Sequence, residues 1–107
     1  MKIKAKSHYE ARARIAKAMA HPSRLLILDA LAQAELCVAD LTDLVGSDQS
    51  TVSKHLAVLR TAGIVDLRKE GTMAFYRLTI TCLEGFWGCI ETVLARNLEA
   101  DRQALQV

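Results

Sequence analysis

The fold of this 107-residue sequence is decided by residues 47–65, "SDQSTVSKHLAVLRTAGIV". Apolar residues recur there at Val52, Leu56 and Leu59, a spacing of four and three that predicts a helix with one apolar stripe. The rest of this helix carries small hydroxyls, an amide and a single lysine in place of the usual mixture of glutamates and lysines. These polar residues are Gln49, Ser50, Thr51, Ser53 and Lys54. This face therefore has almost no long charged side chains that would keep another molecule at a distance.

The residues before this helix predict a second helix that leads into it through a short turn. Residues 35–46, "ELCVADLTDLVG", indicate a short extended piece and then a helix that ends at Gly46, a residue type that often ends helices. Ser47 or Asp48 then caps the start of the next helix. Two helices joined so closely have helix-turn-helix spacing.

The residues after this helix change to an alternating pattern. Gly63 ends the helix, and residues 64–80, "IVDLRKEGTMAFYRLTI", alternate apolar and polar around the turn at 70–72. This pattern predicts a β-hairpin. Arg68 and Lys69 stand beside its tip. A hairpin directly after a helix-turn-helix would be a wing.

Three further helices complete the predicted order. They cover residues 7–20, a segment starting at "HPSRLLILDALAQ" with Pro22 in its first turn, and residues 81–105. The expected fold is mainly α with a β-hairpin, a winged helix-turn-helix in one domain over residues 1–107. The last helix is too apolar to cover its stripe on so small a body, so we expect it to form a dimer contact. That stripe includes Phe86, Trp87, Ile90, Val93 and Leu94.

Composition excludes several classes of protein. Half of the residues are apolar, which argues against disorder, and no run of about 18 apolar residues predicts a membrane span. The first residues lack the apolar core of a secretory signal, so we expect a cytoplasmic protein. The sequence has no glycine-rich phosphate loop, paired acid cluster or Cys/His nucleophile spacing, and we expect no enzymatic activity.

The charges are unevenly distributed along the chain. Residues 1–24 hold seven Lys and Arg against one acid, Glu10, whereas residues 25–107 hold seven against eleven acids. A basic segment on a mildly acidic body suits a polyanion partner.

Three segments together resemble a known family. "HPSRLLILDAL", "ELCVADL" and "DQSTVSKHLAVLRTAGIVDLRKEGTMAFYRL" are similar to the ArsR/SmtB family of small winged-helix repressors, over roughly residues 10–80. The resemblance implies a homodimer that binds double-stranded operator DNA. It also implies that the first and last helices make the dimer contact. Release from DNA would follow when a metal ion, a metalloid or a redox signal reaches a sensing site.

The polar helix face fits this expected DNA partner. A helix enters the major groove, where Gln49 could pair with adenine and Lys54 with guanine or phosphate. Ser50 and Ser53 could contact either a base or phosphate, with Thr51 at the edge of the face. Arg68 and Lys69 would reach phosphate or the neighbouring minor groove. His55 has two interpretations, a DNA contact or a histidine packed in the core.

The cysteines depart from the best-known sensors of the family, which resemble "ELCVCDLC". Only Cys37 of those three thiols is present, because Ala39 and Thr42 replace the others. The resemblance also implies a zinc-type site in the last helix, which uses aspartate and histidines. No histidine follows His55 in this sequence, so we expect that site to be absent.

Cys82 and Cys89 remain as candidates on the last helix. Their α-carbons would lie roughly 10.5 Å apart, too far for two sulfurs to share one ion, since such sulfurs lie about 4 Å apart. We therefore expect a site between chains, or one that recruits Cys37.

The thiols leave three interpretations open. A thiol set without histidine favours As(III), Cd(II) or Pb(II) as inducer over zinc, with no metal required for folding. Oxidation of the same thiols is a second possibility. The third is a winged-helix module that binds protein and has inert cysteines, but it would not need the polar face or the basic wing.

Overall fold

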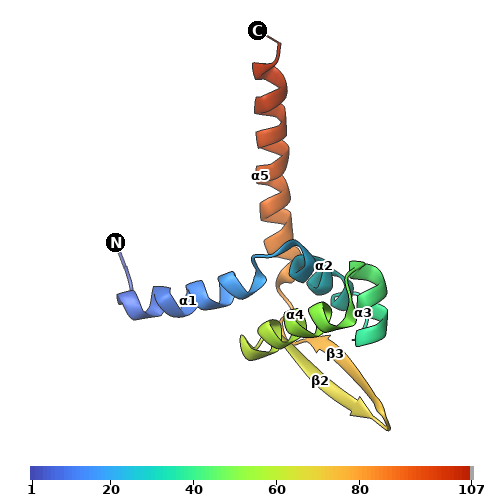
Figure 1. Ribbon diagram of the computed structural model, residues 1–107. Coiled ribbons are helices and arrows are strands. Elements are labelled where there is room, and N and C mark those ends of the chain that lie inside the picture. The colour runs from blue at the N-terminus through green and yellow to red at the C-terminus, as the bar shows by residue number, and fades with distance from the viewer. Residues whose placement is uncertain (107) are drawn as a thin grey trace.

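The computed structural model describes residues 1–106 of the chain, and residue 107 lies outside the described part. The elements in chain order are α1 (Lys6–Met19), α2 (Pro22–Leu31), β1 (Leu36–Cys37), α3 (Val38–Val45), α4 (Gln49–Thr61), β2 (Val65–Glu70), β3 (Met73–Leu78) and α5 (Leu83–Ala104). The predicted winged helix-turn-helix is confirmed: α3 and α4 form the two-helix unit, and the hairpin of β2 and β3 is the wing (Figure 1). The outer helices agree with the predicted ranges 7–20 and 81–105 to within two residues at each end.

The turn between α3 and α4 forms as the sequence predicts. Gly46 follows α3 with a φ of 77°, in the left-handed region that glycine enters without steric cost. Asp48 then caps α4, and its Oδ1 accepts a hydrogen bond from the backbone N–H of Thr51 at 2.7 Å. These two residues fix the direction in which α4 leaves α3.

The sheet has one strand more than the predicted hairpin. The hairpin pairs Val65 with Leu78 at its base and Glu70 with Met73 at its tip. The extended piece before α3 is β1, which pairs antiparallel with β3 and gives the strand order β1-β3-β2. Because β1 leads directly into α3, this pairing ties the wing to the helix-turn-helix.

The hydrophobic core lies behind α4. The predicted stripe of Val52, Leu56 and Leu59 is fully buried. It packs with residues from α2, α3 and the start of the wing: Ile27, Leu28, Leu41, Ile64 and Val65. Burying a side chain of this size contributes about 1.5–3 kcal/mol, so the stripe holds the polar side of α4 toward the surface.

Helices α1 and α5 extend away from this core. Figure 1 shows α5 leaving the body in one direction, the wing in the opposite direction and α1 to the side. The radius of gyration is 17.1 Å, whereas a compact chain of this length has a radius of about 13 Å. No helix in residues 1–106 combines the length and hydropathy needed to cross a bilayer.

Candidate functional site

The first two turns of α4 present most of the predicted polar residues to the surface. Gln49, Ser50, Ser53 and Lys54 are exposed. Thr51 is half-buried, and its backbone N–H donates to the Asp48 cap. We call Gln49, Ser50, Thr51, Ser53 and Lys54 the α4 polar face.

The cap is charged as well as geometrically fixed. The backbone N–H of Thr51, followed by its side chain, lowers the pKa of Asp48, and Lys54 lowers it further. The carboxylate therefore stays ionised at the positive end of the helix dipole. This arrangement holds the first turn of α4 in place without covering its polar face.

His55 is the one predicted DNA contact that the structure corrects. Its side chain lies on the inner side of α4 and the residue is only 8% exposed. Its Nδ1 accepts a hydrogen bond from Nε of Arg24 at 3.1 Å, and its ring lies 4.4 Å from that of His21. Burial, followed by the neighbouring His21 and Arg24, lowers the pKa of His55. An enclosed, neutral imidazole that accepts a hydrogen bond from Arg24 agrees with the interpretation of His55 as a histidine packed in the core. We therefore remove His55 from the candidate DNA contacts.

The two basic residues of the wing differ in their surroundings. Nε of Arg68 forms an ion pair with Glu35 at 2.9 Å, and the terminal nitrogen Nη1 forms one with Glu70 at 2.7 Å. The guanidinium carbon lies 5.1 Å from the centre of the Phe75 ring. The hydrogen bonds to Glu70 and Glu35 raise the pKa of Arg68. Lys69 is exposed and makes no ion pair within residues 1–106. Lys69 is therefore the wing cation that is available to another molecule.

Sequence reasoning missed one basic residue beside the α4 polar face. Arg60 is exposed and lines a hollow between α4 and the wing together with Ser53 and Tyr76. Arg60 follows Ser53 by seven residues, or about two helical turns, so both lie on the same side of α4. This seven-residue spacing from Ser53 could have identified Arg60 as a candidate contact from the sequence.

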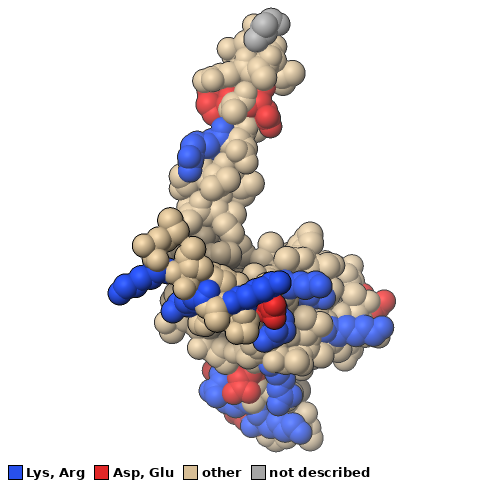
Figure 2. Space-filling view, turned by 90° about the vertical axis from the view of Figure 1, so that its left-hand side faces the viewer, with Lys and Arg blue, Asp and Glu red and all other residues tan. Residues whose placement is uncertain are grey.

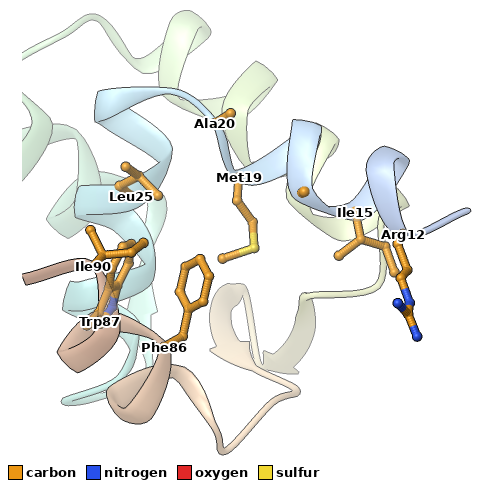
Figure 3. Close-up of a pocket in the computed structure, with 9 residues that line it drawn as sticks. Arg12, Ile15, Met19, Ala20, Leu25, Phe86, Trp87 and Ile90 are labelled. Atoms are coloured by element: carbon orange, nitrogen blue, oxygen red, sulfur yellow. The ribbon is translucent and has the colours of Figure 1, made fainter. Parts of the chain in front are cut away.

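A second surface lies between α1 and the base of α5. It is a hollow of about 470 Å³ with an almost wholly apolar wall (Figure 3). Its lining residues are Arg12, Ile15, Ala16, Met19, Ala20, Leu25, Phe86, Trp87 and Ile90. An open apolar hollow of this size suits the insertion of apolar side chains from another molecule.

The predicted dimer residues continue from this hollow along α5. Phe86 is 46% exposed, Val93 48% and Leu94 54%, while Ile90 is half-buried. Trp87 differs, because it packs against the core of its own chain. Its Nε1 is buried without an acceptor in the described part of the chain.

The three cysteines are not brought together within one chain. Cys37 is buried at the start of α3, where its Sγ donates to Oδ2 of Asp40 at 3.2 Å. Cys82 is exposed at the residue before α5, and Cys89 is exposed within that helix. Residues 1–106 contain no group of three His, Cys, Asp or Glu side chains that could hold one metal ion.

Comparison with known proteins relates this architecture to transcriptional regulators. Residues 21–66 match the sequence model of the family described as "Bacterial regulatory protein, arsR family". The HTH-type transcriptional regulator MJ1325 from Methanocaldococcus jannaschii is 48% identical over 69 residues, which cover 64% of this chain and 78% of that protein. The biofilm growth-associated repressor from Agrobacterium fabrum is 48% identical over 62 residues, 58% of this chain and 53% of the repressor.

A solved structure is similar over nearly the whole chain. It is the homodimeric winged helix-turn-helix DNA-binding domain of Mb0332 from Mycobacterium bovis, with a TM-score of 0.74 and 31% sequence identity. The similarity covers 94% of this chain and 95% of that domain.

Proposed function

Because this chain belongs to the ArsR family of bacterial regulatory proteins and is a DNA-binding transcriptional regulator, we propose that it is a repressor whose α4 polar face reads an operator. The observation that carries the proposal is the exposure of Gln49, Ser50, Ser53 and Lys54 on one helix beside a wing. We propose that it acts in the cytoplasm, where bacterial DNA is accessible.

The proposed contacts follow from the donors and acceptors on the α4 polar face. Gln49 presents an amide that can make two hydrogen bonds with adenine, and Lys54 donates to guanine or phosphate. Ser50, Ser53 and Thr51 add short hydroxyls that permit close approach of the helix to the groove. Arg60 on α4 and Lys69 on the wing then contact phosphate beside that groove.

Arg68 has a different proposed role. Its guanidinium is engaged by Glu35 and Glu70, so a direct phosphate contact would require it to exchange those partners. We propose that Arg68 mainly holds the wing against the segment before β1, and that Lys69 makes the wing contact.

Selection of binding sequences from random duplex DNA tests the DNA-reading proposal. The wild-type protein should enrich one sequence, and its affinity for that sequence should exceed its affinity for an unrelated duplex by about 10³-fold or more. Equal affinity for the two duplexes would contradict operator reading and favour the protein-binding module.

We also propose that the regulator is a homodimer joined through α1 and α5. The support is the apolar hollow beside Phe86 and Ile90, the exposed Val93 and Leu94, and a radius of gyration well above that of a compact chain. The DNA-binding domain of Mb0332, which is similar to 94% of this chain, is homodimeric. Two copies would place two α4 helices on two half-sites of the operator.

We propose that an inducer acts at the cysteines, with Cys82 and Cys89 as the principal residues, because both are exposed, Cys82 directly before α5 and Cys89 within it. A shared ion would need thiols from both copies, since residues 1–106 of one chain hold no group of three ligands. All-thiol ligands favour soft ions such as As(III), Cd(II) or Pb(II). Cys37 is the less favoured partner, because it is buried and bonded to Asp40.

Oxidation is the second candidate signal, favoured by the same exposure of Cys82 and Cys89. Two thiols from opposite copies would form a disulfide and pass two electrons and two protons to the oxidant. An ion releases DNA only if it binds the DNA-free arrangement of the dimer more tightly than the DNA-bound one. A disulfide releases DNA only if it forms more favourably in the DNA-free arrangement.

Release of labelled operator separates these signals. Wild type, Cys37→Ser, Cys82→Ser and Cys89→Ser are each treated with arsenite, cadmium, lead and a persulfide donor. We expect wild type and Cys37→Ser to respond to at least one agent, and Cys82→Ser or Cys89→Ser to stay bound. If wild type stays on DNA with every agent, none of the three cysteines senses these inducers; if only Cys37→Ser is insensitive, the site is at α3.

A further inference from the structure

We propose that the exposed basic side of α1 is a second DNA-binding surface, which holds the phosphate backbone beside the groove that α4 enters. This surface consists of Lys6, Arg14 and Lys17, and we call it the α1 basic face. All three residues are exposed. The inference rests on the proposed function, because it adds a surface to the same DNA-binding site.

The α1 basic face is separate from the side of α1 that we propose for dimerisation. At 3.6 residues per turn, Lys6, Arg14 and Lys17 fall within about 80° of one another around the helix. The α1 residues that line the hollow with α5 are Arg12, Ile15, Ala16 and Met19, and they lie on roughly the opposite side. Dimerisation through α5 therefore leaves the α1 basic face open.

The α1 basic face reaches α4 at one residue, Arg14. Arg14, Ile15 and Ala18 of α1 line one hollow together with residues of the last turn of α4 and the residue after it, Val58, Thr61 and Ala62. A duplex held by the α4 polar face and by Arg60 would therefore pass close to Arg14. The two basic surfaces can be continuous along one stretch of phosphate backbone.

The Lys and Arg side chains of α1 are not engaged in ion pairs in the described part of the chain. None of the Lys and Arg residues of α1 forms an ion pair within residues 1–106, whereas Arg68, Arg77 and Arg102 each do. Figure 2 shows Lys and Arg side chains gathered over the body and the wing, below most of α5. Unpaired cations on an otherwise mildly acidic protein suit a dense polyanion, and duplex DNA carries one charge per about 1.7 Å of its length.

Glu10 is the single acid among residues 1–24, and it falls within the same arc of α1. It partly neutralises the α1 basic face. Removing its charge should therefore strengthen DNA binding, an effect opposite to that of removing the cations.

The test compares matched double variants of the full chain. Arg14→Gln/Lys17→Gln removes two charges from the α1 basic face, and Arg96→Gln/Arg102→Gln removes two from α5. Affinity for the selected operator and for an unrelated duplex is measured between 50 and 200 mM salt, conditions over which phosphate contacts change affinity strongly. Sedimentation of each variant reports its assembly.

We expect the α1 variant to bind both duplexes more weakly by a similar factor. The slope of log affinity against log salt should become shallower by up to about 4 for a dimer that loses four phosphate contacts. The α5 control should keep the wild-type slope, and Glu10→Gln should bind both duplexes more tightly.

Three outcomes would overturn the proposal. If the slope of the α1 variant is unchanged while Lys54→Ala loses its preference for the operator, the α1 surface is wrong and the proposed function stands. If the α1 variant dissociates into monomers, the α1 basic face binds the second copy of the chain. If wild type binds no duplex, the proposed function fails and this surface fails with it.

Discussion

His55 shows how one enclosed side chain joins the DNA-binding helix to the rest of the protein. Its Nδ1 accepts from Nε of Arg24, and a terminal nitrogen of Arg24 donates to the carbonyl of Ala18 at 3.3 Å. One guanidinium thus connects α1, α2 and α4. Protonation of His55 would remove its acceptor and place two cations side by side.

The lowered pKa of His55 predicts that stability falls in mild acid. The unfolded chain binds this proton near pH 6.5, whereas the folded protein binds it only at lower pH. The His55 contribution to the free energy of unfolding is therefore complete above about pH 6.5 and is lost as the pH falls through the folded pKa.

Urea unfolding at pH 8 and pH 5 measures this dependence. We expect His55→Gln to lose less stability between the two pH values than wild type, because glutamine does not titrate. His8→Gln is the control, since His8 is exposed at the start of α1, and should follow wild type. Equal losses in wild type and His55→Gln would show that His55 does not set the acid sensitivity.

At the scale of elements, the start of α4 depends on Asp48. Asp48→Ala removes the acceptor for the backbone N–H of Thr51 and should lower the free energy of unfolding at pH 7. Asp48→Ser keeps a side chain that caps helices well, so this variant should have a higher free energy of unfolding than Asp48→Ala. Because the pKa of Asp48 is lowered in the folded protein, the benefit of aspartate over serine should disappear as the pH falls through that folded pKa. Equal stability of the two variants at pH 7 would contradict this capping role.

The elements that could be predicted from the sequence are those with local signals. Gly46 and Asp48 mark the helix ends by their own chemistry, and the stripe of Val52, Leu56 and Leu59 reports burial through its period. The hairpin follows from alternation over seventeen residues, 64–80. Each signal lies within the element that it predicts or directly beside it.

The features that could not be predicted depend on residues far apart in the chain. The strand β1 has two residues, too few to show alternation, and it becomes a strand because β3 pairs with it. Glu35 and Arg68 are 33 residues apart, so nothing local indicates that a carboxylate occupies the wing arginine. His55 lies at the edge of its stripe, and Arg24 and His21 on another segment decide that it is enclosed.

At the scale of the whole molecule, the open arrangement of α1 and α5 predicts a dimer. Leu94→Glu should yield a monomer, because it would place a charge in an apolar contact between helices. Leu94 is 54% exposed and is not among the residues that pack against the core, so the variant should still fold. Trp87 is less suitable for this test, because it packs against the core of its own chain.

Sedimentation at micromolar concentration reads out assembly, and circular dichroism checks the fold. Arg96→Glu is the control, since it stands two residues away on a different side of α5, and it should remain dimeric. The monomer should also bind the operator much more weakly, because two half-sites can no longer be engaged together. A monomeric wild type, or a dimeric Leu94→Glu, would contradict the α1–α5 contact.

The α4 polar face is tested most directly by the affinity of Ser53→Ala and Lys54→Ala for the selected operator. Both side chains are exposed, so both variants should melt as wild type does. Each should lose about 1–3 kcal/mol of operator binding, roughly 5- to 150-fold in affinity. Arg102→Gln, at the far end of α5, should bind as wild type does. Wild-type affinity for the operator in both Ser53→Ala and Lys54→Ala would contradict the assignment of α4 as the helix that reads DNA.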